Sequence, residues 1–182
     1  MSHKFSEKTE TKRLIIANAG LEECYDLQEI CMTWDDKKFM EGEDFEPDFI
    51  RKCLTEGDLP PIPGATKEHY RLKSFHLKES GRLIGFTDLY FGYPSEKMAW
   101  ISIFIISKDY RKKGYAQEVI DSISVECTMA GFNLIGIGVY LKNLRGLRFW
   151  IKAGFREITE ISGDADSGEN AFALIRLMKK LK

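Results

Sequence analysis

A basic, glycine-containing turn is the stretch of this chain whose residue types most clearly suggest chemistry. The turn covers residues 111–116 (Arg-Lys-Lys-Gly-Tyr-Ala), between an apolar run that ends at Ile106 and an amphipathic run that begins near Val119. A glycine turn that opens a helix directs free backbone N–H groups and the positive end of the helix dipole at one point, where an anion can bind. On its own the turn leaves two interpretations open, a phosphate-bearing ligand or an ordinary strand–helix connection with a solvated basic surface.

The segments around the turn alternate between strand and helix periodicity. The strand before the turn and the strand after its helix should be parallel and joined by a right-handed crossover, whereas the strands between residues 70 and 106 should be antiparallel neighbours. The sequence therefore predicts an α/β (α+β) fold with a mixed, mostly antiparallel sheet of about seven strands and helices on both faces. The predicted strands are 12–17, 70–77, 83–91, 97–106, 134–141, 155–161 and 171–178, and the predicted helices are 21–32, 48–55, the segment from the turn to about 130, and 143–152.

Length and composition limit the classes of protein to which the chain could belong. Its 182 residues, 43% hydrophobic and 30% charged, suit one domain over residues 1–182, with poor order expected in residues 1–10. The net charge of −1 offers no general attraction to nucleic acid or to an anionic membrane, and no apolar run is long enough to span a bilayer. We expect a soluble cytoplasmic protein without a metal site, because its four cysteines lack C-x-x-C spacing and histidine neighbours.

A second pattern follows the turn at a suggestive distance. Residues 143–155 read Asn-Leu-Arg-Gly-Leu-Arg-Phe-Trp-Ile-Lys-Ala-Gly-Phe. The two stretches, in this order, resemble the motifs R/Q-x-x-G-x-G/A and N-x-x-A/G-x-x-F/L-aromatic-x-x-x-G-F of the GNAT (Gcn5-related N-acetyltransferase) superfamily, and the resemblance covers nearly the whole chain. It implies a splayed parallel strand pair that admits acetyl-CoA, and acetyl transfer to an amine by direct attack in a ternary complex.

The resemblance also assigns residues to the donor site. It implies that the backbone amides of residues 111–116 hold the CoA pyrophosphate, and that Phe104 and Ile106 bond the pantetheine arm through their backbone. The Phe104 N–H would also polarise the thioester carbonyl, as an oxyanion-hole donor does. The implied donor-site residues are Phe104, Ile105, Ile106, Arg111, Lys112, Lys113, Gly114, Tyr115, Ala116, Asn143, Phe149 and Trp150.

The sequence departs from the family pattern where the chemistry would occur. The family's usual proton-donating tyrosine is replaced by Trp150, whose indole N–H cannot act as an acid near neutral pH, so Tyr140 is a candidate in its place. The glutamate that some members use as a base is replaced by Trp100, which leaves Asp88 and Glu96 as the nearest carboxylates in sequence, or a water chain with no single base. The catalytic residues we predict are Phe104, Tyr140 and Asp88.

The acceptor is indicated only by charge. Residues 22–58 contain 13 Asp and Glu against four Lys and Arg, which fits either a binding site for a cationic amine or a solvated acidic surface. A non-catalytic acyl-CoA-binding regulatory module and a domain for another phosphate ligand remain alternatives, and the exposed ends of the sheet leave a homodimer open. The acidic cluster comprises Glu41, Glu43, Asp44, Glu46 and Asp48.

Overall fold

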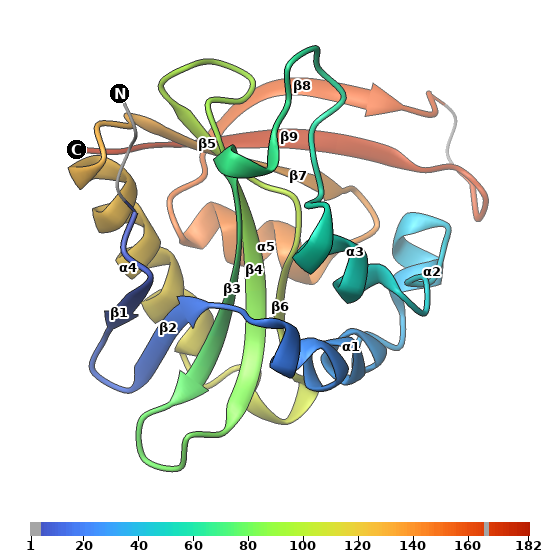
Figure 1. Cartoon of the computed structure of the whole chain (residues 1–182). Helices are drawn as coiled ribbons and strands as arrows, with labels where there is room; N and C mark the ends of the chain where they lie inside the picture. The colour runs from blue at the N-terminus through green and yellow to red at the C-terminus, as the bar shows by residue number, and fades with distance from the viewer. Residues whose placement is uncertain (1–4, 166–167) are drawn as a thin grey trace.

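The computed structural model describes residues 5–165 and 168–182, and its main feature is a mixed nine-stranded sheet (Figure 1). The spatial order is β1-β2-β3-β4-β5-β7-β9-β8, with β6 alongside β4. The strands are β1 Lys8–Glu10, β2 Leu14–Asn18, β3 Tyr70–Leu77, β4 Leu83–Phe91, β5 Met98–Ile101, β6 Phe104–Ile106, β7 Leu134–Tyr140, β8 Glu157–Gly163 and β9 Ala173–Lys180. The α-helices are α1 Cys24–Met32, α2 Lys37–Glu41, α3 Phe49–Thr55, α4 Tyr115–Met129 and α5 Leu144–Lys152.

The pairing confirms the predicted fold class. Every pair of neighbouring strands is antiparallel except β5 and β7, which flank the crossover through α4 and run parallel. The sheet has more strands than the predicted seven, because the segment 97–106 forms two short strands and because Lys8–Glu10 pairs with β2. Poor order was expected for residues 1–10, of which residues 1–4 lie outside the described part of the chain. The single-domain interpretation stays a prediction.

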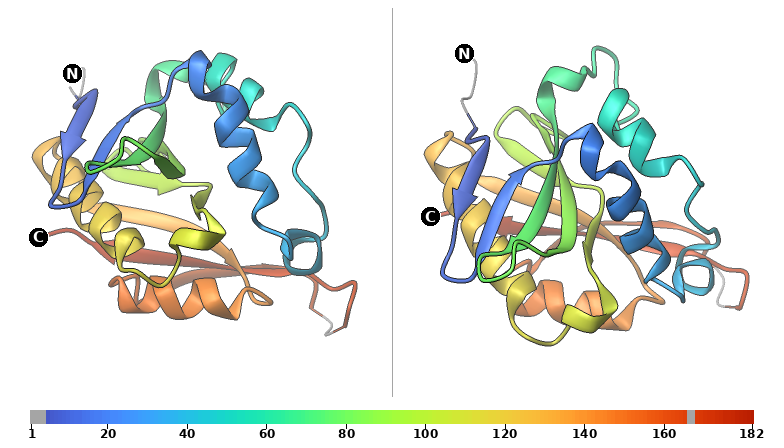
Figure 2. Two further views of the ribbon diagram at one scale, coloured as in Figure 1. Left: turned by 90° about the horizontal axis from the view of Figure 1, so that it is seen from below. Right: turned by 60° about the horizontal axis from the view of Figure 1, so that its bottom comes forward.

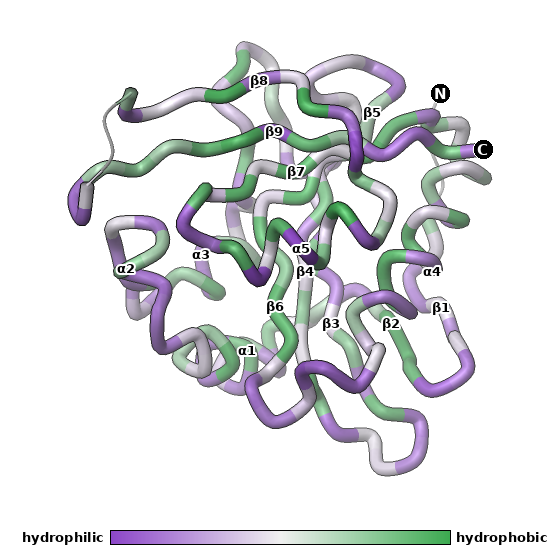
Figure 3. Tube along the Cα trace, turned by 180° about the vertical axis from the view of Figure 1, so that it is seen from behind, coloured by the Kyte–Doolittle hydropathy of each residue, from purple (hydrophilic) through white to green (hydrophobic). Residues whose placement is uncertain are grey.

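Helices cover both faces of the sheet, as the sequence predicts (Figure 2). One hydrophobic cluster packs buried residues of α4 and α5 against the sheet, and a second packs residues of α1 and α3 against its other face. Figure 3 shows the contrast that matters for the site: β6 is hydrophobic, whereas the connection after α2 is hydrophilic. That connection was predicted as acidic, but the five-residue helix α2 before it was not predicted.

The edges of the sheet are its short first strand and β8. Six of the seven residues of β8 are exposed, including Ile158 and Ile161, so this edge is open along most of its length. The homodimer expected from exposed sheet ends stays a prediction. No helix in the described part of the chain has the length and apolar character that a bilayer crossing requires.

Candidate active site

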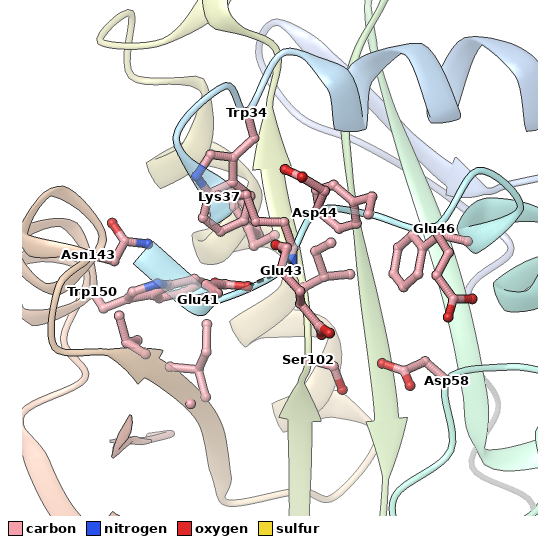
Figure 4. Close-up of a pocket in the computed structure, with 17 residues that line it drawn as sticks. Trp34, Lys37, Glu41, Glu43, Asp44, Glu46, Asp58, Ser102, Asn143 and Trp150 are labelled. Atoms are coloured by element: carbon pink, nitrogen blue, oxygen red, sulfur yellow. Dashed lines mark hydrogen bonds and ion pairs between the residues drawn. The ribbon is translucent and has the colours of Figure 1, made fainter. Parts of the chain in front are cut away.

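A pocket of about 350 Å³ lies where β6 and β7 separate (Figure 4). Parallel pairing of β5 with β7 ends at Ile101 and Ile137, and β6 then pairs with β4 while β7 continues to Tyr140. The segment after α1 covers this gap and supplies most of the charged residues of the pocket. The lining residues are Trp34, Lys37, Glu41, Glu43, Asp44, Phe45, Glu46, Phe49, Asp58, Ser102, Ile103, Phe104, Ile137, Gly138, Val139, Asn143 and Trp150.

An extra residue on the β5–β6 side causes the strands to separate. Tyr90 and Phe86 are four positions apart on β4, but their partners Trp100 and Ile105 are five positions apart. Such a β-bulge bends the strand that carries it and shifts the register of everything beyond it. The continuous strand predicted over 97–106 is therefore broken at Ser102 and Ile103.

Asp88 holds the bulge in place. Its Oδ1 accepts hydrogen bonds from the backbone N–H groups of Ser102 (2.8 Å) and Ile103 (2.9 Å), and its own N–H donates to the Ile103 carbonyl (3.2 Å). Asp88 is 1% exposed and does not line the pocket, so the structure places this predicted catalytic residue beneath the site. Its carboxylate positions the backbone on which Phe104 is carried.

The bulge determines which backbone groups face the gap. Beyond it, the Ser107 N–H donates to the Ile84 carbonyl (2.8 Å), so alternate residues counted back from Ser107 direct their backbone groups at β4. Ile105 is one of these, whereas Phe104 and Ile106 direct theirs away from β4 and into the gap. A strand without the extra residue would have the opposite orientation. The Phe104 N–H thus points into the gap, and its hydrogen bond to a ligand stays a prediction.

The turn before α4 has the geometry of an anion cradle. Lys112 (φ 61°) and Gly114 (φ 83°) are both left-handed, and Gly114 is the N-cap of α4 without a side-chain cap. The first N–H groups of the helix therefore have no intrahelical partner, and they belong to half-buried residues that follow the exposed residues 112–114. Glycine adopts the left-handed conformation at position 114 without strain, and a Cβ there would lie 3.3 Å from the Arg13 guanidinium. The turn thus has the features of an anion site, and its role in holding the CoA pyrophosphate stays a prediction.

The cations of the turn differ in how free they are. Arg111 lies inward, where its Nε donates to the Ile106 carbonyl (2.8 Å) and its Nη2 to the Thr33 carbonyl (3.2 Å). Lys112 and Lys113 are exposed at the mouth of the turn, and the Lys113 Nζ lies 5.2 Å from the Tyr110 ring centroid. Arg111 was predicted as a donor-site residue, and the structure assigns its side chain to joining β6 with the end of α1.

The start of α5 forms the opposite side of the gap. The Asn143 Oδ1 accepts from the Gly146 N–H (2.8 Å), and a Cβ at Gly146 would lie only 2.8–2.9 Å from the Asn143 side chain. This explains the small residue in the second motif. Trp150 lines the pocket, and its ring is edge-on to the Phe104 ring. The Phe149 ring packs on the Phe104 ring at a centroid distance of 6.0 Å.

Four of the five residues of the predicted acidic cluster line the pocket, and Asp48 does not. Lys37 is buried among them: its Nζ donates to the Glu43 carbonyl (3.0 Å), lies 3.3 Å from the Glu41 carboxylate and sits 4.7 Å from the Phe45 ring centroid. The pocket already binds one ammonium group in this way. Asp44 and Glu46 complete the acidic side, close to solvent (Figure 4).

Three cations attach residues 33–48, which we call the acidic wall, to the donor side. Besides the bond from Arg111 to Thr33, Lys108 of the turn region pairs with Asp35 (2.6 Å), and Arg145 of α5 pairs with Asp36. Residues 33–36, immediately before α2, are thus fixed to both sides of the gap.

Other candidates lie outside the pocket. Tyr140 is at the end of β7, edge-on to Phe172, and burial raises its pKa with a further contribution from Glu41 and Glu43. Trp100 is buried in the hydrophobic cluster that packs α1 and α3 on the sheet. Glu96 is exposed at the β4–β5 connection. Among the described residues, no group of three or more His, Cys, Asp or Glu could hold a metal ion.

Asp58 and Ser102 are among the pocket residues that were not singled out from the sequence. Asp58 lies in the proline-rich loop after α3, and nothing in the pattern placed that loop against the bulge. Burial raises the pKa of Asp58, while a hydrogen bond from Ser102 acts in the other direction. Burial and the nearby charge of Asp58 also raise the pKa of Asp88 to about 8, which favours its protonated form at pH 7.

The sheet with its separated parallel strands, the free backbone donors in the gap and the anion cradle beside it together define an acetyltransferase-type fold. The chain resembles an acetyltransferase from Thermus thermophilus (TM-score 0.71, 17% identity, 95% of this chain and 100% of that chain). It also resembles a GNAT-family acetyltransferase from Bacillus anthracis (TM-score 0.70, 16% identity, 95% and 98%). A third similar structure is a spermidine N-acetyltransferase from Vibrio cholerae in complex with CoA and spermine (TM-score 0.70, 14% identity, 92% and 95%).

The family model described as "Acetyltransferase (GNAT) family" matches residues 21–155, which include the acidic wall, the bulge and both motifs. The chain belongs to the GNAT acetyltransferase family. The search of curated proteins found no match.

Proposed function

We propose that the protein transfers the acetyl group of acetyl-CoA to the primary amine of a cationic acceptor, by direct attack in a ternary complex. The observation that carries this proposal is the pocket in which the Phe104 backbone faces carboxylates of the acidic wall. The donor and acceptor would meet there without a covalent enzyme intermediate.

The donor side would hold acetyl-CoA through backbone groups. The turn at Gly114 would hold the pyrophosphate, and the Phe104 N–H would donate to the thioester oxygen as negative charge develops on it. Trp150 offers no acid, so the CoA thiolate would leave on the strength of its own acidity, that of an ordinary thiol. The predicted role of Tyr140 as an acid stays a prediction, because Tyr140 is not a lining residue.

The acceptor side would select a cation. Five carboxylates and one lysine line the pocket, so its net charge is negative when the carboxylates are ionised. A negative, partly enclosed site raises the local concentration of cationic ligands and rejects anionic ones. The similar Vibrio cholerae structure, named as a spermidine N-acetyltransferase, supports the choice of polyamines as a first test.

Thiol release from acetyl-CoA across a panel of amines tests the proposal. We expect turnover with spermidine, aminoglycosides or lysine-terminal peptides, and little with neutral or acidic amines. Binding of CoA without thiol release above background on any amine would instead favour a non-catalytic acyl-CoA-binding module. A preference for ATP or NAD over CoA in calorimetry would contradict both functions.

We also place the protein in a reducing compartment such as the cytoplasm. All four cysteines are free thiols, and three of them are buried. Burial raises the pKa of Cys31, Cys53 and Cys127 to about 12, which leaves these thiols unreactive. Unchanged activity and mass after mild oxidation would be consistent with packed thiols that have no redox function.

A further inference from the structure

We propose that Asp58 is the base that takes a proton from the ammonium group of the acceptor, and that Ser102 orients its carboxylate. The inference rests on the proposed acetyl transfer to a cationic amine. Some family members use a glutamate as the base, but Trp100 occupies that position in this chain. Asp58 would supply the missing base.

The position of Asp58 relative to the bulge is the first argument. Asp58, Ser102 and Phe104 line the same pocket, and the Asp58 carboxylate lies beside the Ser102 hydroxyl (Figure 4). Ser102 belongs to the bulge and is only two residues before Phe104 along the chain. An amine bound in this pocket would therefore have the Asp58 carboxylate and the Phe104 backbone as neighbours.

The other pocket carboxylates are less suited to the role. Glu41 is paired with Lys37 (3.3 Å), Asp44 with Lys38 (4.0 Å) and Glu46 with Lys52. A carboxylate that already holds one lysine ammonium is less free to take a proton from a second ammonium group. Glu41 keeps its contact with Lys37 although burial raises the pKa of Glu41. Among the described pocket residues, the carboxylates without a lysine or arginine partner are those of Glu43 and Asp58, and Asp58 is the one beside the bulge.

The surroundings of Asp58 suit a base. Its side chain keeps access to solvent through the pocket, while the surrounding protein raises its pKa above the usual range of an aspartate. The groups that face it are the Ser102 hydroxyl, Asp88 on β4, Tyr70 on β3 and Cys53 on α3. Asp88 stays protonated beside an ionised Asp58, since two neighbouring carboxylates resist carrying two charges.

The proton balance of the step is simple. An ammonium proton moves to Asp58, and the free amine then forms a C–N bond to the thioester carbon while the oxyanion receives the Phe104 hydrogen bond. The C–S bond breaks, its electron pair leaves with the CoA sulfur, and the second amine proton neutralises that thiolate. Asp58 returns its proton to solvent, so the products are an amide, CoA thiol and one released proton.

The variant Asp58→Asn tests the proposal with two kinds of acceptor. With spermidine, which is protonated at neutral pH, we expect kcat/KM to fall about 10²–10³-fold, the usual contribution of a general base. With an aniline that carries a separate ammonium group, the pocket can still bind a cation while the reacting nitrogen is already unprotonated. We then expect a loss of less than about fivefold, because no proton must leave before attack. In the wild type we expect kcat/KM to rise with pH as Asp58 loses its proton. In Asp58→Asn this rise should disappear, and the rate should follow the deprotonation of the amine itself.

Glu43→Gln is the matched control, because it removes the same charge from the same pocket. We expect its effect to appear in KM for spermidine and not in the shape of the pH profile. Equal losses with spermidine and with aniline, or an unchanged pH profile in Asp58→Asn, would overturn the role of Asp58 while leaving acetyl transfer intact. A wild-type protein that acetylates no amine would overturn the proposed function and this inference together.

Discussion

The donor side and the acceptor side of the pocket are built in different ways. The donor side uses backbone groups, whose direction is fixed by a bulge and by a left-handed glycine. The acceptor side uses carboxylates on α2 and on the connections around it, most of them exposed and several paired with lysines. Backbone donors give a geometry that few substitutions can imitate, whereas a group of surface carboxylates can change one at a time. The difference suggests that donor binding is strongly constrained and that acceptor choice is adjustable.

Removing the support of the bulge should have the largest effect. In Asp88→Ala the N–H groups of Ser102 and Ile103 lose their acceptor, and the Phe104 N–H no longer points reliably into the gap. We expect kcat to fall about 10²–10³-fold, the cost of losing an oxyanion donor. Asp88→Asn keeps an oxygen acceptor and should retain most of the activity. Full activity in a folded Asp88→Ala variant would show that the donor side is less constrained than we infer.

A side chain at the cradle should act next most strongly, and on the donor alone. Gly114→Val places a β-branched residue at φ 83°, which costs on the order of 1–3 kcal/mol and obstructs the phosphate, so we expect KM for acetyl-CoA to rise about 10–100-fold. KM for the amine should change little. Gly81→Val is the control, since Gly81 has φ 69° with no atom near its missing Cβ and should affect stability only. An equal KM effect in both variants would refute the cradle.

Charge reversal on the acceptor side should have a smaller and salt-dependent effect. Glu43→Lys in the pocket should raise KM for a cationic amine about tenfold, because one carboxylate is replaced by a repelling ammonium in a partly solvated site. KM for acetyl-CoA should stay constant, and high salt should reduce the difference. Asp48→Lys makes the same change outside the pocket and should do little. Similar effects at both positions would indicate general surface attraction without an acceptor site.

The smallest effect concerns stability and pH. The folded state raises the pKa of Asp88 to about 8, above its unfolded value near 3.9, so the native state favours the protonated form. Stability should therefore fall, and Tm with it, as pH rises from about 4 to about 8. Asp88→Asn has no proton to lose at this position and should show a flatter profile in thermal denaturation. An identical decline in both proteins would assign the pH dependence to other groups.

The parts of the site that could be predicted are those that local sequence determines. The turn at Gly114 and the start of α5 at Asn143 are encoded within a few residues, so their motifs locate the beginnings of these two helices correctly. The fold class follows from strand and helix periodicity for the same reason. The sequence also identifies the acidic segment, although not which of its carboxylates face the pocket.

The parts that could not be predicted depend on contacts between distant segments. The strand at 97–106 breaks because Asp88, 14 residues before Ser102, supplies a hydrogen-bond acceptor in the adjacent strand. Asp58 reaches the pocket from a loop whose prolines indicate only irregular structure. Arg111 matches a phosphate-binding motif, yet its guanidinium is bonded to two carbonyls of this chain. Such pairings appear only when the chain is folded.

The anchoring of residues 33–36 has a consequence for how such a protein could acquire a new acceptor. One end of the acidic wall is fixed to the donor side by Arg111, Lys108 and Arg145, and the other end runs into α3, which is packed on the sheet. The stretch between, from α2 to the start of α3, is an exchangeable insert between two fixed ends. A different sequence of similar length could be grafted there and present new chemistry to the same thioester. Engineering of acceptor preference should therefore begin with this insert.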